Sequence, residues 1–180
     1  KINPDIIMYG EGWTGGESTL PESERGMKIN APRTPGIGMF SDDIRDAVKG
    51  HVFYMDELGF VNGAADRGEK LKQAVTGAKW AKSPMQSINY LSCHDNYTLW
   101  DRFIISNSHE SEEMRIRMNK LAAAILFTAQ GIPFFLHGEE FARTKISEAD
   151  GTPVENSYCS PLSVNAIDYD RAEQFSDLKA

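Results

Sequence analysis

Cysteine is scarce in this sequence, and long apolar runs are missing from it. The 180 residues include two cysteines, Cys93 and Cys159, which form no C-x-x-C pair. A disulfide framework or a cysteine-rich zinc site is therefore not indicated, and we expect both thiols to be free. No apolar stretch approaches the roughly 20 residues of a membrane-spanning helix, and the N-terminal residues lack the basic-then-apolar order of a secretory signal. We expect no membrane partner, and the compartment stays open.

Basic residues are outnumbered by acidic ones. The chain has 19 Lys and Arg against 26 Asp and Glu, a formal net charge of −7. Nucleic-acid binding needs a basic surface, so nucleic acid is not an expected partner and neutral ligands are favoured. With 41% hydrophobic and 25% charged residues, the composition is that of one globular domain with a sizeable core.

Three short apolar runs each end at charged side chains. The runs cover residues 6–9, 87–92 and 132–136, and they are nearly continuous rather than alternating in apolar residues. That pattern is typical of parallel strands buried on both faces. A fourth strand is predicted over 37–40. The polar residues that follow the three runs are Glu11, His94, Asp95, His137, Glu139 and Glu140.

Helical patterns separate these runs. Residues 41–50 are predicted to form a helix that Ser41 caps and Gly50 ends, with acidic residues in the first turn. A weaker helical pattern covers 69–76. The clearest pattern covers 112–131, where a C-terminal glycine again stands in the capping position. Its expected buried stripe consists of Met114, Met118, Leu121, Ile125 and Ala129.

The alternation of strands and helices predicts a parallel α/β sheet. The stretches 14–35 and 143–165 are polar and rich in Gly, Pro, Ser and Asn, so they are predicted to be long loops of the kind that often carry function. Ligands bind beyond the carboxyl ends of the strands in open α/β sheets and in barrels alike. We therefore expect the polar residues after the three runs to meet around one cleft.

Carboxylates that face each other across a cleft with aromatic walls are typical of glycoside hydrolysis. The leaving oxygen needs a proton from an acid, and the developing oxocarbenium ion needs a nearby anion. Glu11 is a candidate for the acid, because Tyr9 and Trp13 would supply apolar surroundings that keep a carboxyl protonated. Asp95 is a candidate for the anion, and His94 for a donor to a sugar hydroxyl. Flat faces for sugar rings are offered by Trp13, Tyr97 and Trp100.

Each of these residues also has a structural interpretation. Glu11 taken alone is typical of a solvated loop residue, His94 of a hydrogen-bonded structural histidine, and Trp100 of a core residue at a helix start. His137 and the two glutamates after it offer metal ligands, but H-x-E-E lacks the i, i+4 histidine pair of a zinc helix. We expect no metal site, and the functional hypothesis depends on the joint placement of the residues.

Three motifs occur in a fixed order along the chain, namely YGEGW, HDN and GIPFFLHGEEFARTK. They resemble the regions at the fifth, seventh and eighth strands of glycoside hydrolase family 13, the α-amylase superfamily. Further segments are similar to its debranching members, the type I pullulanases. These segments are FSDDIRDAVKG, FVNG, INYLSCHDNYTLWD and ENSYCSP. The resemblance spans essentially the whole chain.

The resemblance implies a fold and an activity. The fold is the C-terminal half, strands 5 to 8, of a (β/α)8 TIM barrel, so that 1–180 is a partial catalytic domain without the nucleophile-bearing first half and the C-terminal β domain. The activity is hydrolysis of α-1,6-glucosidic branch linkages in pullulan, amylopectin or glycogen, with retention of configuration. Branched α-glucan is the implied partner. No cofactor is required for the chemistry, and the structural calcium often found in the family is not assigned to residues here.

Site residues carry over from the matching motifs. Glu11 matches the general acid/base, Asp95 the aspartate that stabilises the transition state, and His94 the histidine that contacts the sugar in the central subsite. Trp13 matches the stacking tryptophan after the acid. The residues implied to bind the substrate are His94, Trp13, Asn96, Tyr97, Asn156 and Tyr158.

One part of the family pattern has no counterpart here. The nucleophilic aspartate of the family lies in a segment like GFRFD, which this sequence does not contain. The chain alone is therefore not expected to hydrolyse glucan. A half barrel has open parallel edges, so self-association is a further expectation. Two other hypotheses stay open, a non-catalytic glucan-binding module and an isoamylase or other amylase-superfamily enzyme of different linkage specificity.

Overall fold

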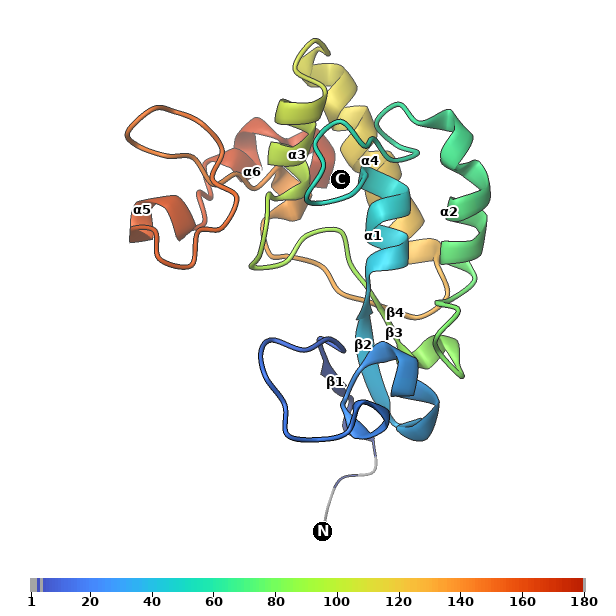
Figure 1. Ribbon diagram of the computed structural model, residues 1–180. Coiled ribbons are helices and arrows are strands. Elements are labelled where there is room, and N and C mark those ends of the chain that lie inside the picture. Colours follow the sequence, from blue (N-terminus) through green and yellow to red (C-terminus); the bar gives the residue numbers. More distant parts are fainter. Residues whose placement is uncertain (1–2, 4, 180) are drawn as a thin grey trace.

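The computed structural model describes residues 3 and 5–179, and within them it contains a four-stranded parallel sheet (Figure 1). Strands that follow each other in the chain are neighbours in the sheet, in the order β1-β2-β3-β4. The strands are β1 (Met8–Gly10), β2 (Ile37–Ser41), β3 (Ser87–Asn89) and β4 (Ile132–Pro133). The predicted parallel α/β sheet is confirmed, although the paired segments are shorter than the apolar runs.

The predicted helices are present, and four helices of the described chain have eight residues or more. These are α1 (Asp42–Lys49), α2 (Gly68–Val75), α3 (Leu99–Ser106) and α4 (Glu112–Thr128). The short helices near the C-terminus are α5 (Leu162–Asn165), α6 (Arg171–Gln174) and α7 (Ser176–Lys179). None of the described helices has the length and apolar character needed to cross a bilayer.

The main core lies where α1, α2, α3 and α4 meet (Figure 1). Ile44 and Val48, one turn apart on α1 as predicted, are fully buried. The other buried members are Ala47, Val61, Ala74, Leu91, Leu99, Phe103, Met118, Ala122 and Leu126. A second cluster joins α3 to the C-terminal segment, and in it the ring of Trp100 packs edge-on against Phe175. Trp100 is therefore a core residue and offers no face to a sugar ring.

The buried face of α4 differs from the predicted stripe. Met118, Ala122 and Leu126 are buried, whereas Met114 and Leu121 are 37% and 45% exposed. The second half of this helix is apolar on nearly every side, so periodicity alone does not select a face. Contacts with α1, α2 and α3 select it instead.

Ser41 and Gly131 lie at the predicted helix ends, but neither has the capping role that was expected of it. The Ser41 hydroxyl is buried and makes no capping hydrogen bond, because Ser41 continues β2 and pairs with Asn89. The capping residue of α4 is Ala129, and Gly131 lies beyond it with a φ of 128°. A side chain at Gly131 would lie 2.7 Å from the Ser87 carbonyl oxygen, so glycine is required by the close approach of two chain segments.

The first strand is less buried than its apolar sequence predicted. Ile6, Ile7, Met8 and Tyr9 are 53–61% exposed. β1 is an edge strand that pairs only with β2, whereas all three residues of β3, inside the sheet, are buried. The expectation that each run is buried on both faces is wrong for β1, and it is also wrong for β4, the other edge strand, where Ile132 is half-buried and Pro133 is exposed.

Candidate active site

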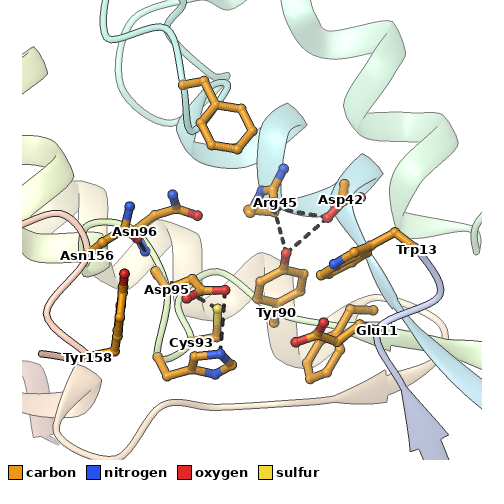
Figure 2. Close-up of a pocket in the computed structure, with 13 residues that line it drawn as sticks. Glu11, Trp13, Asp42, Arg45, Tyr90, Cys93, Asp95, Asn96, Asn156 and Tyr158 are labelled. Carbon is orange, nitrogen blue, oxygen red and sulfur yellow. Dashed lines mark hydrogen bonds and ion pairs between the residues drawn. The ribbon is translucent and has the colours of Figure 1, made fainter. Parts of the chain in front are cut away.

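A cavity of about 490 Å³ opens beyond the carboxyl ends of β1, β2 and β3 (Figure 2). Glu11 directly follows β1, and Asp42 directly follows β2. The segment 93–97, here called the HDN loop, comes after β3. The loop after β4 adds residues from the segment 154–158, here called the NSY loop. The lining residues are Glu11, Trp13, Phe40, Asp42, Arg45, Phe53, Tyr90, Cys93, His94, Asp95, Asn96, Asn156 and Tyr158.

Glu11, His94 and Asp95 come together in this cavity. One side-chain oxygen or nitrogen of each lies within 4.8 Å of the others, and His94 Nε2 is 3.4 Å from Asp95 Oδ2. All three side chains are exposed, so ligand can reach them. The sequence predicted this convergence from the order of strands, because the carboxyl ends of parallel strands meet at one edge of the sheet. The roles assigned to the three residues stay predictions.

The surroundings of Glu11 differ from the expectation. Glu11 is exposed, and Tyr9 points its ring edge-on at Phe40, with the ring centroids 5.8 Å apart. Trp13 lines the cavity, and Lys28 Nζ lies 4.8 Å from the centroid of its ring. The apolar enclosure expected from Tyr9 and Trp13 is therefore not formed within the described chain, because β1 is at the sheet edge.

The substrate-binding candidates fall into two groups. Asn96, Asn156 and Tyr158 line the cavity with Trp13 and His94, and Tyr158 is 82% exposed. Tyr97 is not among the described residues that line it. The chain turns toward α3 after Asn96, and the main-chain carbonyl of Tyr97 faces the buried Lys49 ammonium at 3.4 Å.

Glu139 and Glu140 do not reach the cavity, contrary to the expectation that all three apolar runs end at one cleft. The chain turns through Gly138, which has left-handed backbone, into the 3-10 turn Glu139–Phe141. Glu139 is buried there, and a Glu140 carboxylate oxygen accepts a hydrogen bond from the Gly138 amide at 2.9 Å. Glu11, His94 and Asp95 form the one group of three in the described chain close enough to share a metal ion. The expectation of a site without metal stays a prediction.

Sequence reasoning missed a polar network on the cavity wall, shown by the dashed lines in Figure 2. Arg45 Nη1 donates to Tyr90 Oη at 2.6 Å, and Tyr90 Oη donates to Asp42 Oδ1 at 3.0 Å. Asp42 also pairs with Arg45 at 2.9 Å and with Lys28. Burial raises the pKa of Tyr90, so its hydroxyl stays neutral and can donate. Asp42 directly follows β2, a position that marks it as a candidate site residue, although an acidic residue in the first turn of a helix is also explained by the helix alone.

Three further charges are buried behind the HDN loop. Lys49, Glu139 and Lys145 are 2–4% exposed. Burial raises the pKa of Glu139 to about 7, although Ser92 and Lys49 act to lower it. Neither carboxylate oxygen of Glu139 has a hydrogen-bond partner of ordinary geometry in the described chain. Burial, and then the Arg45 charge, lower the pKa of Lys49 to about 8. Burial also lowers the pKa of Lys145. These groups face the protein and not the cavity.

The fold and the site together define a class: an α/β protein with a polar cavity, partly walled by aromatic rings, at the carboxyl ends of its parallel strands. No protein-family model matches the sequence.

Comparison with individual proteins points to pullulanases. The chain is 40% identical over 184 residues to a pullulanase of Bacillus subtilis (strain 168), an alignment that covers 98% of this chain and 25% of that protein. The crystal structure of a pullulanase from Anoxybacillus sp. LM18-11, complexed with maltotriose, matches 99% of this chain and 25% of its own with 42% identity and a TM-score of 0.91. The type I pullulanase of Bacillus subtilis complexed with maltose matches 98% of this chain with 39% identity and a TM-score of 0.89.

The chain therefore spans about a quarter of the length of these relatives. Over that quarter it is homologous to pullulanases in sequence and in structure, which confirms the resemblance to pullulanases. The assignment to the α-amylase superfamily and to strands 5 to 8 of a barrel stays a prediction.

Proposed function

We propose that this chain is part of a debranching glycoside hydrolase of the α-amylase superfamily, which cleaves α-1,6-glucosidic branch linkages in pullulan, amylopectin or glycogen with retention of configuration. The observation that carries the proposal is the convergence of Glu11, His94 and Asp95 within 4.8 Å, in a segment homologous to pullulanases. The four parallel strands would be the fifth to eighth strands of a (β/α)8 barrel.

Each residue has a role in the proposed reaction. Glu11 protonates the leaving glycosidic oxygen and later takes a proton from the attacking water. Asp95 stabilises the positive charge that develops on the sugar ring, because an anion close to that charge lowers the barrier. His94 donates a hydrogen bond to a sugar hydroxyl. The nucleophilic aspartate would be supplied by another part of the enzyme, since no GFRFD-like segment occurs here.

Glucan is the ligand that the walls of the cavity favour. Trp13 and Tyr158 present exposed aromatic rings on which sugar rings can stack, and Asn96 and Asn156 offer amide groups to hydroxyls. The relatives from Anoxybacillus and Bacillus subtilis were crystallised with maltotriose and maltose. Both observations support an α-glucan as the substrate.

The test combines binding and hydrolysis on the 180-residue chain. We expect the chain to bind maltotriose in a calorimetric titration and to release no reducing sugar from pullulan. Glu11→Gln should leave hydrolysis at zero, and Glu17→Gln, at an exposed loop glutamate, serves as the matched control. Hydrolysis that Glu11→Gln abolishes and Glu17→Gln does not would show that a nucleophile lies within this chain. Failure to bind any maltooligosaccharide would contradict the proposed ligand.

A second test uses the longer enzyme that we propose. Glu11→Gln there should slow pullulan hydrolysis by about 10²–10⁴-fold, the usual contribution of a positioned acid. An aryl glycoside whose leaving group needs no proton should lose far less, because Glu11 then has no proton to supply in the first step. Equal losses on both substrates would contradict the acid role.

Two other functions make different predictions. A non-catalytic glucan-binding module would bind maltotriose without hydrolysis in the longer protein as well, and the exposure of Glu11 is the observation that favours it. An isoamylase-type enzyme would debranch amylopectin or glycogen but act poorly on pullulan. The ratio of reducing sugar released from pullulan and from glycogen separates these alternatives.

A further inference from the structure

Lys145 joins the two loops that carry site residues. Its ammonium nitrogen donates to the Asn96 carbonyl oxygen at 2.7 Å and to the Glu155 carbonyl oxygen at 3.0 Å. Asn96 belongs to the HDN loop, and Glu155 precedes Asn156 in the NSY loop. The lysine is 3% exposed, so its head group does not reach the cavity and cannot contact a ligand there. We call these two hydrogen bonds the lysine bridge.

The backbone of Lys145 is fixed independently of its ammonium group. Its amide donates to Asp101 Oδ2 at 2.9 Å, and its carbonyl accepts from the Val154 amide at 2.8 Å. The neighbouring Thr144 hydroxyl donates to Asp101 Oδ1. Asp101 lies fully buried in α3, so the backbone of Lys145 is anchored to a core helix.

The carbonyl that Lys145 holds belongs to a strained residue. Asn96 has a φ of 57°, in the left-handed region that non-glycine residues rarely adopt and that asparagine tolerates better than most. Its amide donates to Asn156 Oδ1 at 3.2 Å, and its side-chain amide donates to Glu155 Oε1 at 3.4 Å. Strained backbone persists when several contacts determine it together.

Burying an ammonium group in a protein is costly unless hydrogen bonds offset the lost hydration. The described chain offers the head group of Lys145 two main-chain carbonyl oxygens, and no carboxylate forms an ion pair with it. An uncharged side chain of similar length would fill the same space without that cost. A stabilising packing role alone does not explain a lysine here.

We propose that Lys145 is a positioning residue: by joining the HDN and NSY loops, the lysine bridge holds Asp95 and Asn156 at fixed places on one side of the cavity. The effect on glucan binding rests on the proposed function, whereas the effect on loop order does not. Lys49, whose ammonium faces the Tyr97 carbonyl at 3.4 Å, acts weakly on the same loop.

Hydrogen exchange followed by mass spectrometry tests the bridge in the 180-residue chain. Lys145→Met keeps the length of the side chain and removes its donors, so amides in 93–98 and 154–159 should exchange at least about tenfold faster, the loss expected for a charge-assisted hydrogen bond. Amides of α4 should not change. Leu126→Ala is the control for general destabilisation, since Leu126 is fully buried and touches neither loop. It should accelerate exchange in α4 without a selective effect on the loops.

Maltotriose titration gives the second reading. Lys145→Met should weaken binding by about tenfold at unchanged overall fold, and Leu126→Ala should not. Unchanged exchange in both loops of folded Lys145→Met would overturn the proposal. If the unmodified chain binds no maltooligosaccharide, the proposed function fails, while the exchange data still decide whether the bridge orders the loops.

A measurement on the unmodified chain covers the case in which Lys145→Met does not fold. Nuclear magnetic resonance should detect a slowly exchanging Lys145 ammonium signal with scalar coupling across the hydrogen bonds to the carbonyl carbons of Asn96 and Glu155. A Lys145 ammonium group that exchanges as fast as that of the exposed Lys72, without such coupling, would overturn the proposal.

Discussion

Two groups of charged side chains lie on either side of the HDN loop. Glu11, His94 and Asp95 are exposed in the cavity, where water hydrates them until a ligand arrives. Lys49 and Glu139 are buried behind the loop, where the charged form of each is disfavoured. The difference separates two situations of charge. Exposed groups cost little to keep and are free to react, whereas buried groups are costly to keep charged and are shielded from a ligand.

The largest expected effect is on catalysis, and it comes from the exposed residues Glu11, His94 and Asp95. Asp95→Asn in the proposed longer enzyme should lower pullulan hydrolysis by about 10²–10³-fold, since it removes an anion that stabilises the developing positive charge. The same substitution in the 180-residue chain should change the free energy of unfolding by less than about 0.5 kcal/mol, as for other exposed sites. Reducing-sugar release and urea unfolding measure the two quantities. A large loss of stability would place Asp95 with the buried group.

The next effect is on stability, and it depends on pH. The pKa of Glu139 is raised from 4.5 to about 7, so the unfolded chain releases this proton before the folded chain does, and stability should fall between those two pH values. The pKa of Lys49 is lowered from 10.5 to about 8, so the folded chain releases its proton first and stability should rise again above pH 8. The minimum therefore lies between about pH 7 and 8.

Glu139→Gln tests this expectation by urea unfolding across the pH range. The variant should lose the decrease on the acid side, which amounts to at most about 3 kcal/mol for Glu139. Glu140→Gln, next to it in the chain, is the control and should keep the decrease. A decrease of equal size in both variants would show that other groups cause it.

The smallest effect is expected at an exposed ion pair far from the site. Lys72 Nζ lies 2.6 Å from Glu69 Oε1 on α2, and both side chains are more than 70% exposed. Lys72→Ala should change the free energy of unfolding by no more than about 0.5 kcal/mol. Calorimetric unfolding of this variant beside Lys145→Met compares an exposed with a buried lysine. Equal losses would mean that burial does not decide what a charge contributes here.

Much of the fold followed from the sequence because its signals are local. Apolar runs predicted the positions of the four strands. Periodic apolar positions predicted α1 and α4, and a weaker helical pattern predicted α2. The convergence of Glu11 with His94 and Asp95 followed from topology alone, since Glu11 directly follows β1 and the HDN loop lies beyond the carboxyl end of β3.

The remaining features depend on the direction that the chain takes after a strand. The left-handed turn at Gly138 carries Glu139 into the interior, and a sequence pattern does not show whether such a turn leads inward or outward. Tyr97 does not line the cavity for the same kind of reason, because the chain turns toward α3 after Asn96. The network of Asp42, Arg45 and Tyr90 joins residues up to 48 positions apart, which periodicity cannot detect.

The edge position of β1 has a consequence for how the site is assembled. Glu11 is held by a strand of three residues with one neighbour, whereas Asp95 follows a strand with a partner on each side. Whatever segment pairs with the free side of β1 would also fix the place of Glu11. Completion of the sheet and alignment of the proposed proton donor would then be a single structural event.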